Sequence, residues 1–157
     1  MTKTTGVSLA SLNARKAAEV PIQFEYVLEG KPTGLFFRVL GSQGATVTQS
    51  INRLVNERRK EEAAKAAQAT PGEVVFTAIE DDVAFAQRLA AVRLVGWRKP
   101  GETEGLAPDQ VERFQGIEDD WSAEAALTLC QTNPDIAAQV TAASNRLSNF
   151  TKASPTV

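Results

Sequence analysis

Few side chains in this sequence could carry catalysis. The chain of 157 residues contains no histidine and one cysteine, Cys130. Hydrolases of the Ser-His-Asp or Cys-His type move protons through an imidazole, and ordinary zinc sites combine several His and Cys ligands. The missing histidines therefore exclude both classes. A single cysteine forms no disulfide within the chain, which fits a reducing cytoplasm.

Three segments still have spacings that suggest chemistry. Gly41–Gly44 follows a predicted strand and precedes a helix, but it lacks the Gly-Lys-Ser/Thr that ends a phosphate loop, and we interpret it as a turn. Glu118–Asp120 with Glu124 offers oxygen ligands for Mg²⁺ or Ca²⁺, yet carboxylates before a helix are better explained by helix electrostatics. Cys130 lies among leucines and alanines and is interpreted as a small buried hydrophobe. We therefore expect a non-enzymatic protein without metal or cofactor.

The charge distribution is uneven. The 17 basic and 19 acidic residues give a net charge of −2, which does not indicate a nucleic-acid-binding protein. Residues 101–135 hold one basic and nine acidic residues, or 1 − 9 = −8. This segment could steer a basic partner, although a solvated surface with carboxylates at helix starts is the simpler interpretation.

No membrane or secretory signal is evident. Residues 1–6 are polar and precede no long apolar run, so they do not resemble a signal peptide. No window approaches the roughly 18–20 apolar residues of a membrane-spanning helix. We expect an intracellular protein that makes no contact with membranes.

The N-terminal third predicts a flexible arm followed by a hairpin. Residues 1–19 mix small and polar types and predict a flexible arm. Apolar residues then alternate with polar ones over 22–28, the pattern of a half-buried strand. A second apolar run over 35–40 can pair with it across a five-residue turn at Gly30–Gly34. The sequence therefore predicts a β-hairpin over 21–41.

The rest of the chain predicts helices. We expect helices over 45–69, 72–97, 122–132 and 134–150, with a short additional helix near 108–115, and a disordered tail at 151–157. The predicted fold class is α+β, mainly α. The N-terminal hairpin packs on a helical body of four to five helices, in one domain over 20–150. Beyond Asn56 the first helix is polar on all sides, so it projects into solvent or awaits a partner.

Large aromatic residues can serve either as core or as interface hot spots. The core is favoured for Trp97, whereas for Phe150 both interpretations stay open. The last helix also carries an apolar stripe that ends at Phe150. The candidate partner-binding residues are Trp97, Trp121, Val140, Leu147, Asn149 and Phe150.

Taken in order, these segments resemble the tail assembly chaperones of long-tailed bacteriophages. The resemblance covers about residues 20–150 and is carried by Val20-Pro21-Ile22, the Gly30–Gly34 turn, Phe36–Leu40, the charged helix, Val95-Gly96-Trp97, Ser122-Ala123-Glu124, Asn133-Pro134-Asp135-Ile136 and Asn149-Phe150. The long acidic segment between Trp97 and Ser122 departs from the family, which more often has a shorter turn there.

The resemblance implies a non-enzymatic role in virion morphogenesis in the cytoplasm of the infected host cell. Such chaperones bind the tape measure protein and recruit tail tube subunits, so the implied partners are the phage tape measure protein and the tail tube protein. Neither nucleic acid nor membrane is an expected partner, and self-association stays open. The alternative function is a minor structural protein that is retained in the head or tail of the virion.

Overall fold

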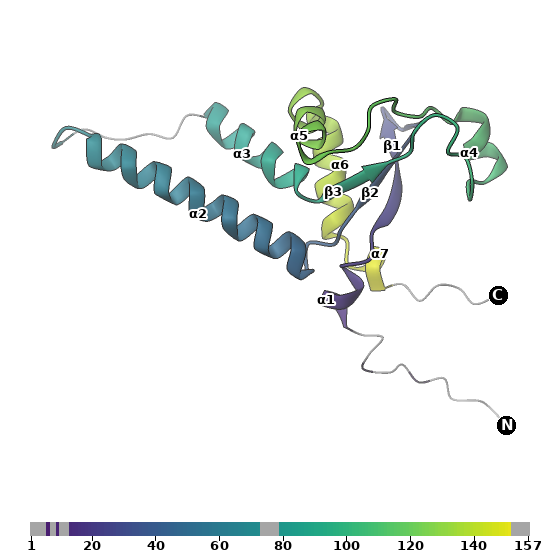
Figure 1. The fold of residues 1–157 in the computed structure, drawn as a ribbon, viewed down its shortest axis with the longest axis horizontal. Coiled ribbons are helices and arrows are strands. Elements are labelled where there is room, and N and C mark those ends of the chain that lie inside the picture. The colour runs from purple at the N-terminus through teal and green to yellow at the C-terminus, as the bar shows by residue number, and fades with distance from the viewer. Residues whose placement is uncertain (1–5, 7–8, 10–12, 73–78, 152–157) are drawn as a thin grey trace.

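The computed structural model describes residues 6, 9, 13–72 and 79–151 (Figure 1). An antiparallel sheet has the order β1-β2-β3, with β1 at Ile22–Leu28, β2 at Lys31–Val39 and β3 at Leu94–Trp97. The helices of the described part are α1 (Ala14–Ala17), α2 (Ala45–Gln68), α3 (Ile79–Ala91), α4 (Pro108–Arg113), α5 (Ala123–Thr132), α6 (Pro134–Asn145) and α7 (Ser148–Thr151). The predicted α+β, mainly α class is confirmed.

The hairpin is confirmed, but its turn is tighter than predicted. Ile22 faces Val39 and Leu28 faces Lys31, so only Glu29 and Gly30 connect the strands. Both residues have positive φ, 50° and 77°, which is the geometry that matches the twist of a two-residue hairpin. The predicted turn at 30–34 is wrong because Lys31–Gly34 already belong to β2.

The helix predicted over 72–97 is wrong at its C-terminal end. Helix α3 stops at Ala91, and Leu94–Trp97 forms β3, which pairs with β2 so that Trp97 faces Phe37. Two backbone bonds flank this pairing, from Leu40 N to Arg93 O at 3.0 Å and from Arg98 N to Phe36 O at 3.1 Å. Without this pairing, Phe36 O of β2 and the adjoining Leu40 N would lack these partners, and this long-range requirement overrides the helical pattern. Residues 73–78, where the predicted helix begins, lie outside the described residues.

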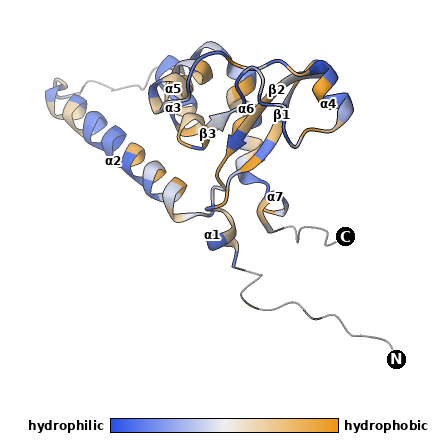
Figure 2. Ribbon diagram, turned by 45° about the vertical axis from the view of Figure 1, so that its right-hand side comes forward, coloured by the Kyte–Doolittle hydropathy of each residue, from blue (hydrophilic) through white to orange (hydrophobic). Residues whose placement is uncertain are grey.

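One face of the sheet forms the main core with α3, α5 and α6. Phe37 is fully buried and contacts Trp97 edge to face, with ring centroids 6.5 Å apart. Figure 2 shows hydrophobic residues along the sheet and hydrophilic residues along the middle of α2. Gln139 of α6 contacts the outer side of β1, where its side chain accepts from Val27 N at 3.1 Å and donates to Val27 O at 2.6 Å.

The helix predicted over 134–150 is interrupted. Helix α6 ends at Asn145, Arg146 is extended, and α7 follows at Ser148–Thr151. Ser144 is buried and donates to Leu40 O at 2.7 Å, while the Asn149 side chain donates to Ala143 O at 3.1 Å. The bond from Asn149, and a bond from Ser42 N to Ser144 O at 3.1 Å, occupy carbonyl groups in the last turn of α6, where the helix ends.

Residues 13–19 belong to the fold, contrary to the predicted flexible arm over 1–19. Ala18 is buried, and its carbonyl accepts from Gly41 N at 2.9 Å. The Glu19 carboxylate accepts from Thr46 N at 2.9 Å and from the Thr46 hydroxyl at 2.6 Å, at the start of α2. Residues 1–5, 7–8 and 10–12 of the predicted arm, and 152–157 of the predicted tail, lie outside the described residues.

The acidic segment 98–121, here called the strap, lies across the sheet. Gln115 N donates to Gly34 O at 2.9 Å, and Ile117 N donates to Arg98 O at 3.0 Å. A Cβ at Gly34, whose φ is 78°, would collide with the backbone of Arg113, so glycine permits this close approach. The short helix predicted near 108–115 is present as α4.

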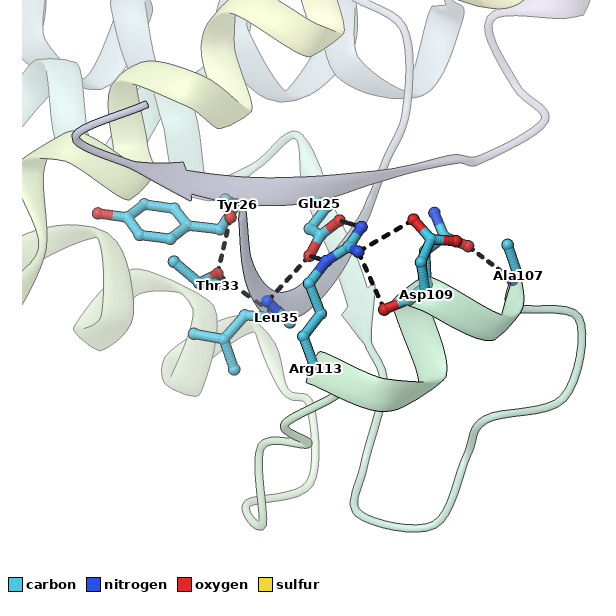
Figure 3. Close-up of polar contacts among 9 residues, drawn as sticks. Glu25, Tyr26, Thr33, Leu35, Ala107, Asp109 and Arg113 are labelled. Carbon is cyan, nitrogen blue, oxygen red and sulfur yellow. Dashed lines mark hydrogen bonds and ion pairs between the residues drawn. The ribbon is translucent and has the colours of Figure 1, made fainter. Parts of the chain in front are cut away.

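Figure 3 shows the ionic contact that fixes the strap to the hairpin. Arg113 donates to both carboxylate oxygens of Glu25, from Nε at 2.7 Å and from Nη2 at 2.6 Å, and Gly34 N donates to the same carboxylate at 2.9 Å. Hydrogen bonding from Arg113 holds the pKa of Glu25 below its usual value. This paired geometry is the stronger kind of ion pair because two bonds fix both groups.

Candidate protein-binding groove

A groove lies between α2, α3 and α5. Its cavity has a volume of about 190 Å³, and its lining is apolar except for one arginine. The lining residues are Leu54 from α2, Arg88 and Ala91 from α3, Val92 directly after α3, and Ala123 and Leu127 from α5. A concave apolar surface of this kind suits an apolar side chain of another molecule.

The α2 wall of the groove is held against α3 by ion pairs. Arg58 pairs with Asp82 and, at 3.2 Å, with Glu62, and its guanidinium lies 4.6 Å from the centre of the Phe85 ring. Arg88 contacts Glu57 at 3.3 Å. Val47 and Leu54 are the residues of α2 that are buried. Helix α2 therefore borders the groove without being part of the main core (Figure 1).

The α5 wall belongs to the core. Ser122 caps this helix, since its side chain accepts from Ala125 N at 3.0 Å, as its position before the apolar run predicts. Ala126 and Cys130 are fully buried on the core side, while Leu127 is half-buried and lines the groove. Burial raises the pKa of the Cys130 thiol to about 11, so it is neutral near pH 7, and the prediction of a small buried hydrophobe is confirmed.

Trp121 lies next to the groove. Its indole N–H donates to Leu94 O at 3.1 Å, and its side chain is 40% exposed. Trp121 is two residues from Ala123 in the chain, and Leu94, which accepts its hydrogen bond, is two residues from Val92. Trp121 is therefore close in the chain, and through its hydrogen bond, to residues that line the groove. A fixed, half-exposed tryptophan beside an apolar groove is typical of an interface hot spot.

The six predicted partner-binding residues do not form one surface. Trp97 and Val140 are 5% and 0% exposed and belong to the core, so neither is available to a partner in this conformation. Phe150 is half-buried against the core, whereas Leu147 is 42% exposed just before α7. Asn149 bonds to Ala143. Among the six, only Trp121 adjoins the groove.

Sequence reasoning missed most of the lining. The spacing of apolar residues puts Leu54 on an apolar face of α2, and Leu127 belongs to the apolar run of α5, but no local pattern brings the two together. A usable signal was present in α5, because its apolar residues are too many for one helical face. Leu127 and Leu129 supplement the buried pair Ala126 and Cys130, and this excess indicates a second packed surface.

Other candidate sites have structural roles. Gly41–Gly44 is a turn that leads into α2. The Glu19 carboxylate occupies the start of that helix by accepting a hydrogen bond from Thr46 N. Asp120 pairs with Lys99, and the backbone carbonyl of Asp119 accepts from the Trp97 indole at 2.8 Å. In the part of the chain that the structure describes, no group of three or more His, Cys, Asp or Glu residues could hold a metal ion.

Comparisons with family models, with curated proteins and with solved structures give no match. None of the helices within the described ranges has both the length and the apolar character needed to cross a membrane.

Proposed function

We propose that this protein is a tail assembly chaperone of a long-tailed bacteriophage, which binds the tape measure protein and recruits tail tube subunits. The observation that carries the proposal is the apolar groove between α2, α3 and α5, with the half-exposed Trp121 beside it. A protein that keeps a helical client soluble needs an accessible apolar surface on an otherwise charged body. The order of segments that resembles this family supports the same function.

The first test is a purification of the tagged protein from infected cells. The wild-type protein should bring down the tape measure protein, and purified virions should contain little or none of it. Recovery in purified virions at the level of other structural proteins, without tape measure protein in the pull-down, would favour a minor head or tail component instead.

Substitutions in the groove test the site itself. Ala123→Gln extends a neutral side chain into the groove and should reduce recovery of the tape measure protein by about tenfold or more. Ala142→Gln, at an exposed position of α6, is the matched control and should leave recovery unchanged. Truncation of the C-terminus from Ser144 would be a poor test, because this buried residue bonds to Leu40 and its loss would disturb the fold.

A further inference from the structure

We infer that the outer edge of β1 pairs with the same edge of a second copy of this chain, in an antiparallel arrangement about a twofold axis at Phe24. This pairing goes beyond the proposed function and does not depend on it. Three features of β1 carry it: the backbone groups that point out of the sheet, the partners that some of them already have, and the symmetry of the groups that are left.

Strand β1 forms one border of the sheet, and its pairing with β2 sets the direction of its backbone groups (Figure 1). Phe36 O of β2 accepts a hydrogen bond on the β3 side, so the backbone groups of Phe37, the next residue, face β1. Phe37 lies opposite Phe24, whose backbone groups therefore point inward. Because this direction alternates along a strand, the groups of Gln23 and Glu25 point out of the sheet.

Both ends of this outward edge are closed. Beyond Glu25, the next outward residue is Val27, whose N–H and carbonyl both bond to the Gln139 side chain, at 3.1 and 2.6 Å. On the other side of Gln23, Pro21 has no N–H to offer. Between these positions, the four backbone groups of Gln23 and Glu25, two donors and two acceptors, form no hydrogen bond beyond the hairpin to any residue that the structure describes.

The free groups complement those of a second copy. In an antiparallel pair centred on Phe24, Gln23 of one copy faces Glu25 of the other, and every free group gains a partner. Pro21 of one copy then lies opposite Val27 of the other, where the missing N–H costs nothing because the Val27 groups are already occupied. A shift by two residues would place Glu25 opposite either Pro21 or a second Glu25, which loses a bond or opposes like charges. Such twofold contacts are the commonest way in which identical chains associate.

The side chains on both faces of β1 suit the same pairing. On the core face, Phe24 is half-buried, with its ring centroid 5.8 Å from that of Phe37, and comes to face the Phe24 of the other copy across the axis. Aromatic residues that lie directly opposite each other stabilise a strand pair. On the other face, Glu25, which is paired with Arg113, comes to face the uncharged Gln23. Like charges are therefore not opposed within the paired segment.

Sedimentation and hydrogen exchange test the pairing with the full-length wild-type protein. The paired segment is short, so the dimer should be weak and should form only as the protein concentration rises. By NMR, the amide protons of Gln23 and Glu25 should exchange rapidly in dilute protein and several-fold more slowly when most of the protein sediments as a dimer. The amide of Phe24, which faces β2, should be protected at every concentration.

Two substitutions at one position distinguish the edge from other surfaces. Gln23→Pro removes an outward N–H that forms no bond in the monomer, and should weaken the dimer by about tenfold or more. Gln23→Ala keeps this N–H but loses the same 2.6 Å side-chain contact with Arg98, so it is the matched control and should dimerise nearly as well as the wild-type protein. Near-UV circular dichroism checks that both variants are folded. If Gln23→Pro is not, the exchange measurement on the wild-type protein still decides.

Three outcomes would overturn the inference. These are a protein that stays monomeric at the concentrations used for NMR, a dimer that Gln23→Pro and Gln23→Ala affect equally, and a dimer in which the amides of Gln23 and Glu25 exchange as fast as in the monomer. If the protein stays monomeric but Gln23→Pro, unlike Gln23→Ala, reduces recovery of the tape measure protein, the edge receives a strand of another protein and the second copy is rejected.

Discussion

Helix α2 and the strap are both charged segments beside the body, with α2 and the strap's helix α4 at opposite ends of the molecule, but they are attached differently (Figure 1). The strap is held by backbone hydrogen bonds and by the Glu25–Arg113 pair, in which the Glu25 side chain is 13% exposed. Helix α2 is held by two buried side chains and by ion pairs such as Arg88–Glu57, in which the side chains are 39% and 47% exposed.

The difference shows which charges hold the fold together. Exposed ion pairs contribute little because water and salt screen them, whereas a partly buried pair fixed by several hydrogen bonds contributes more. We therefore expect the strap to behave as part of the core and α2 to be the more weakly attached of the two. A groove with one firm wall and one weakly attached wall can adapt to its occupant.

The largest effect is expected when the attachment of the strap is broken. Arg113→Ala leaves the Glu25 carboxylate with Gly34 N as its remaining hydrogen-bond donor, so the free energy of unfolding should fall by several times the loss expected for an exposed ion pair. Urea denaturation measures this change. Arg53→Ala, at an exposed residue without an ion pair among those described, should change it by less than about 0.5 kcal/mol. Equal losses of unfolding free energy in the two variants would contradict the conclusion that the Glu25–Arg113 pair holds the strap.

A moderate effect is expected at the buried contact of α2. Leu54→Ala removes a side chain that is 6% exposed and lines the groove, so the loss should lie near the low end for leucine, about 2 kcal/mol. Hydrogen exchange should accelerate along α2 and stay unchanged in α5. Uniform acceleration in both helices would mean that α2 unfolds together with the core.

A smaller loss is expected on acidification, and it should involve the strap. The pKa of Glu25 is lowered in the folded protein, so its contribution to stability is full above the ordinary value of 4.5 and decreases as the pH falls through the lowered value. Between neutral and acid pH, the free energy of unfolding, measured by denaturation, should therefore fall more steeply for the wild-type protein than for Glu25→Gln. Identical pH dependence of the two proteins would reject this role for Glu25.

The smallest effect is expected at the exposed ion pair of α2. Arg88→Ala removes the 3.3 Å contact with Glu57, and the free energy of unfolding should fall by about 0.5 kcal/mol, with less effect in high salt. Thermal denaturation at two salt concentrations measures this. A loss as large as that of Arg113→Ala would mean that α2 and the strap are held to the body equally firmly.

Local patterns in the sequence predicted the elements that they determine. The alternation over Ile22–Leu28 predicted β1, the uninterrupted helix-forming run predicted α2 to within one residue, and Ser122 predicted the start of α5. Strand β3 could not be predicted in this way, because Leu94–Trp97 is short and continues the apolar pattern of α3. Its strand conformation depends on pairing with β2, more than fifty residues earlier in the chain.

The groove depends on the same kind of long-range information. The apolar stripe of α2 indicated that Leu54 faces the body, but not that α5 would lie opposite it. The helical spacing that made Val140 and Leu147 members of one stripe likewise failed where α6 ends at Asn145. Tertiary hydrogen bonds, such as the one from Ser42 N to Ser144 O, accompany such boundaries and leave no local signature in the sequence.

The side chains that contact the two outer strands have a consequence for solubility. A strand at the border of a sheet presents backbone groups that can recruit strands of other molecules and begin aggregation. Here the Gln139 amide occupies both polar groups of Val27 on β1, and the Trp121 indole occupies Leu94 O on β3. At these two positions the outer strands are therefore closed to pairing with strands of other molecules.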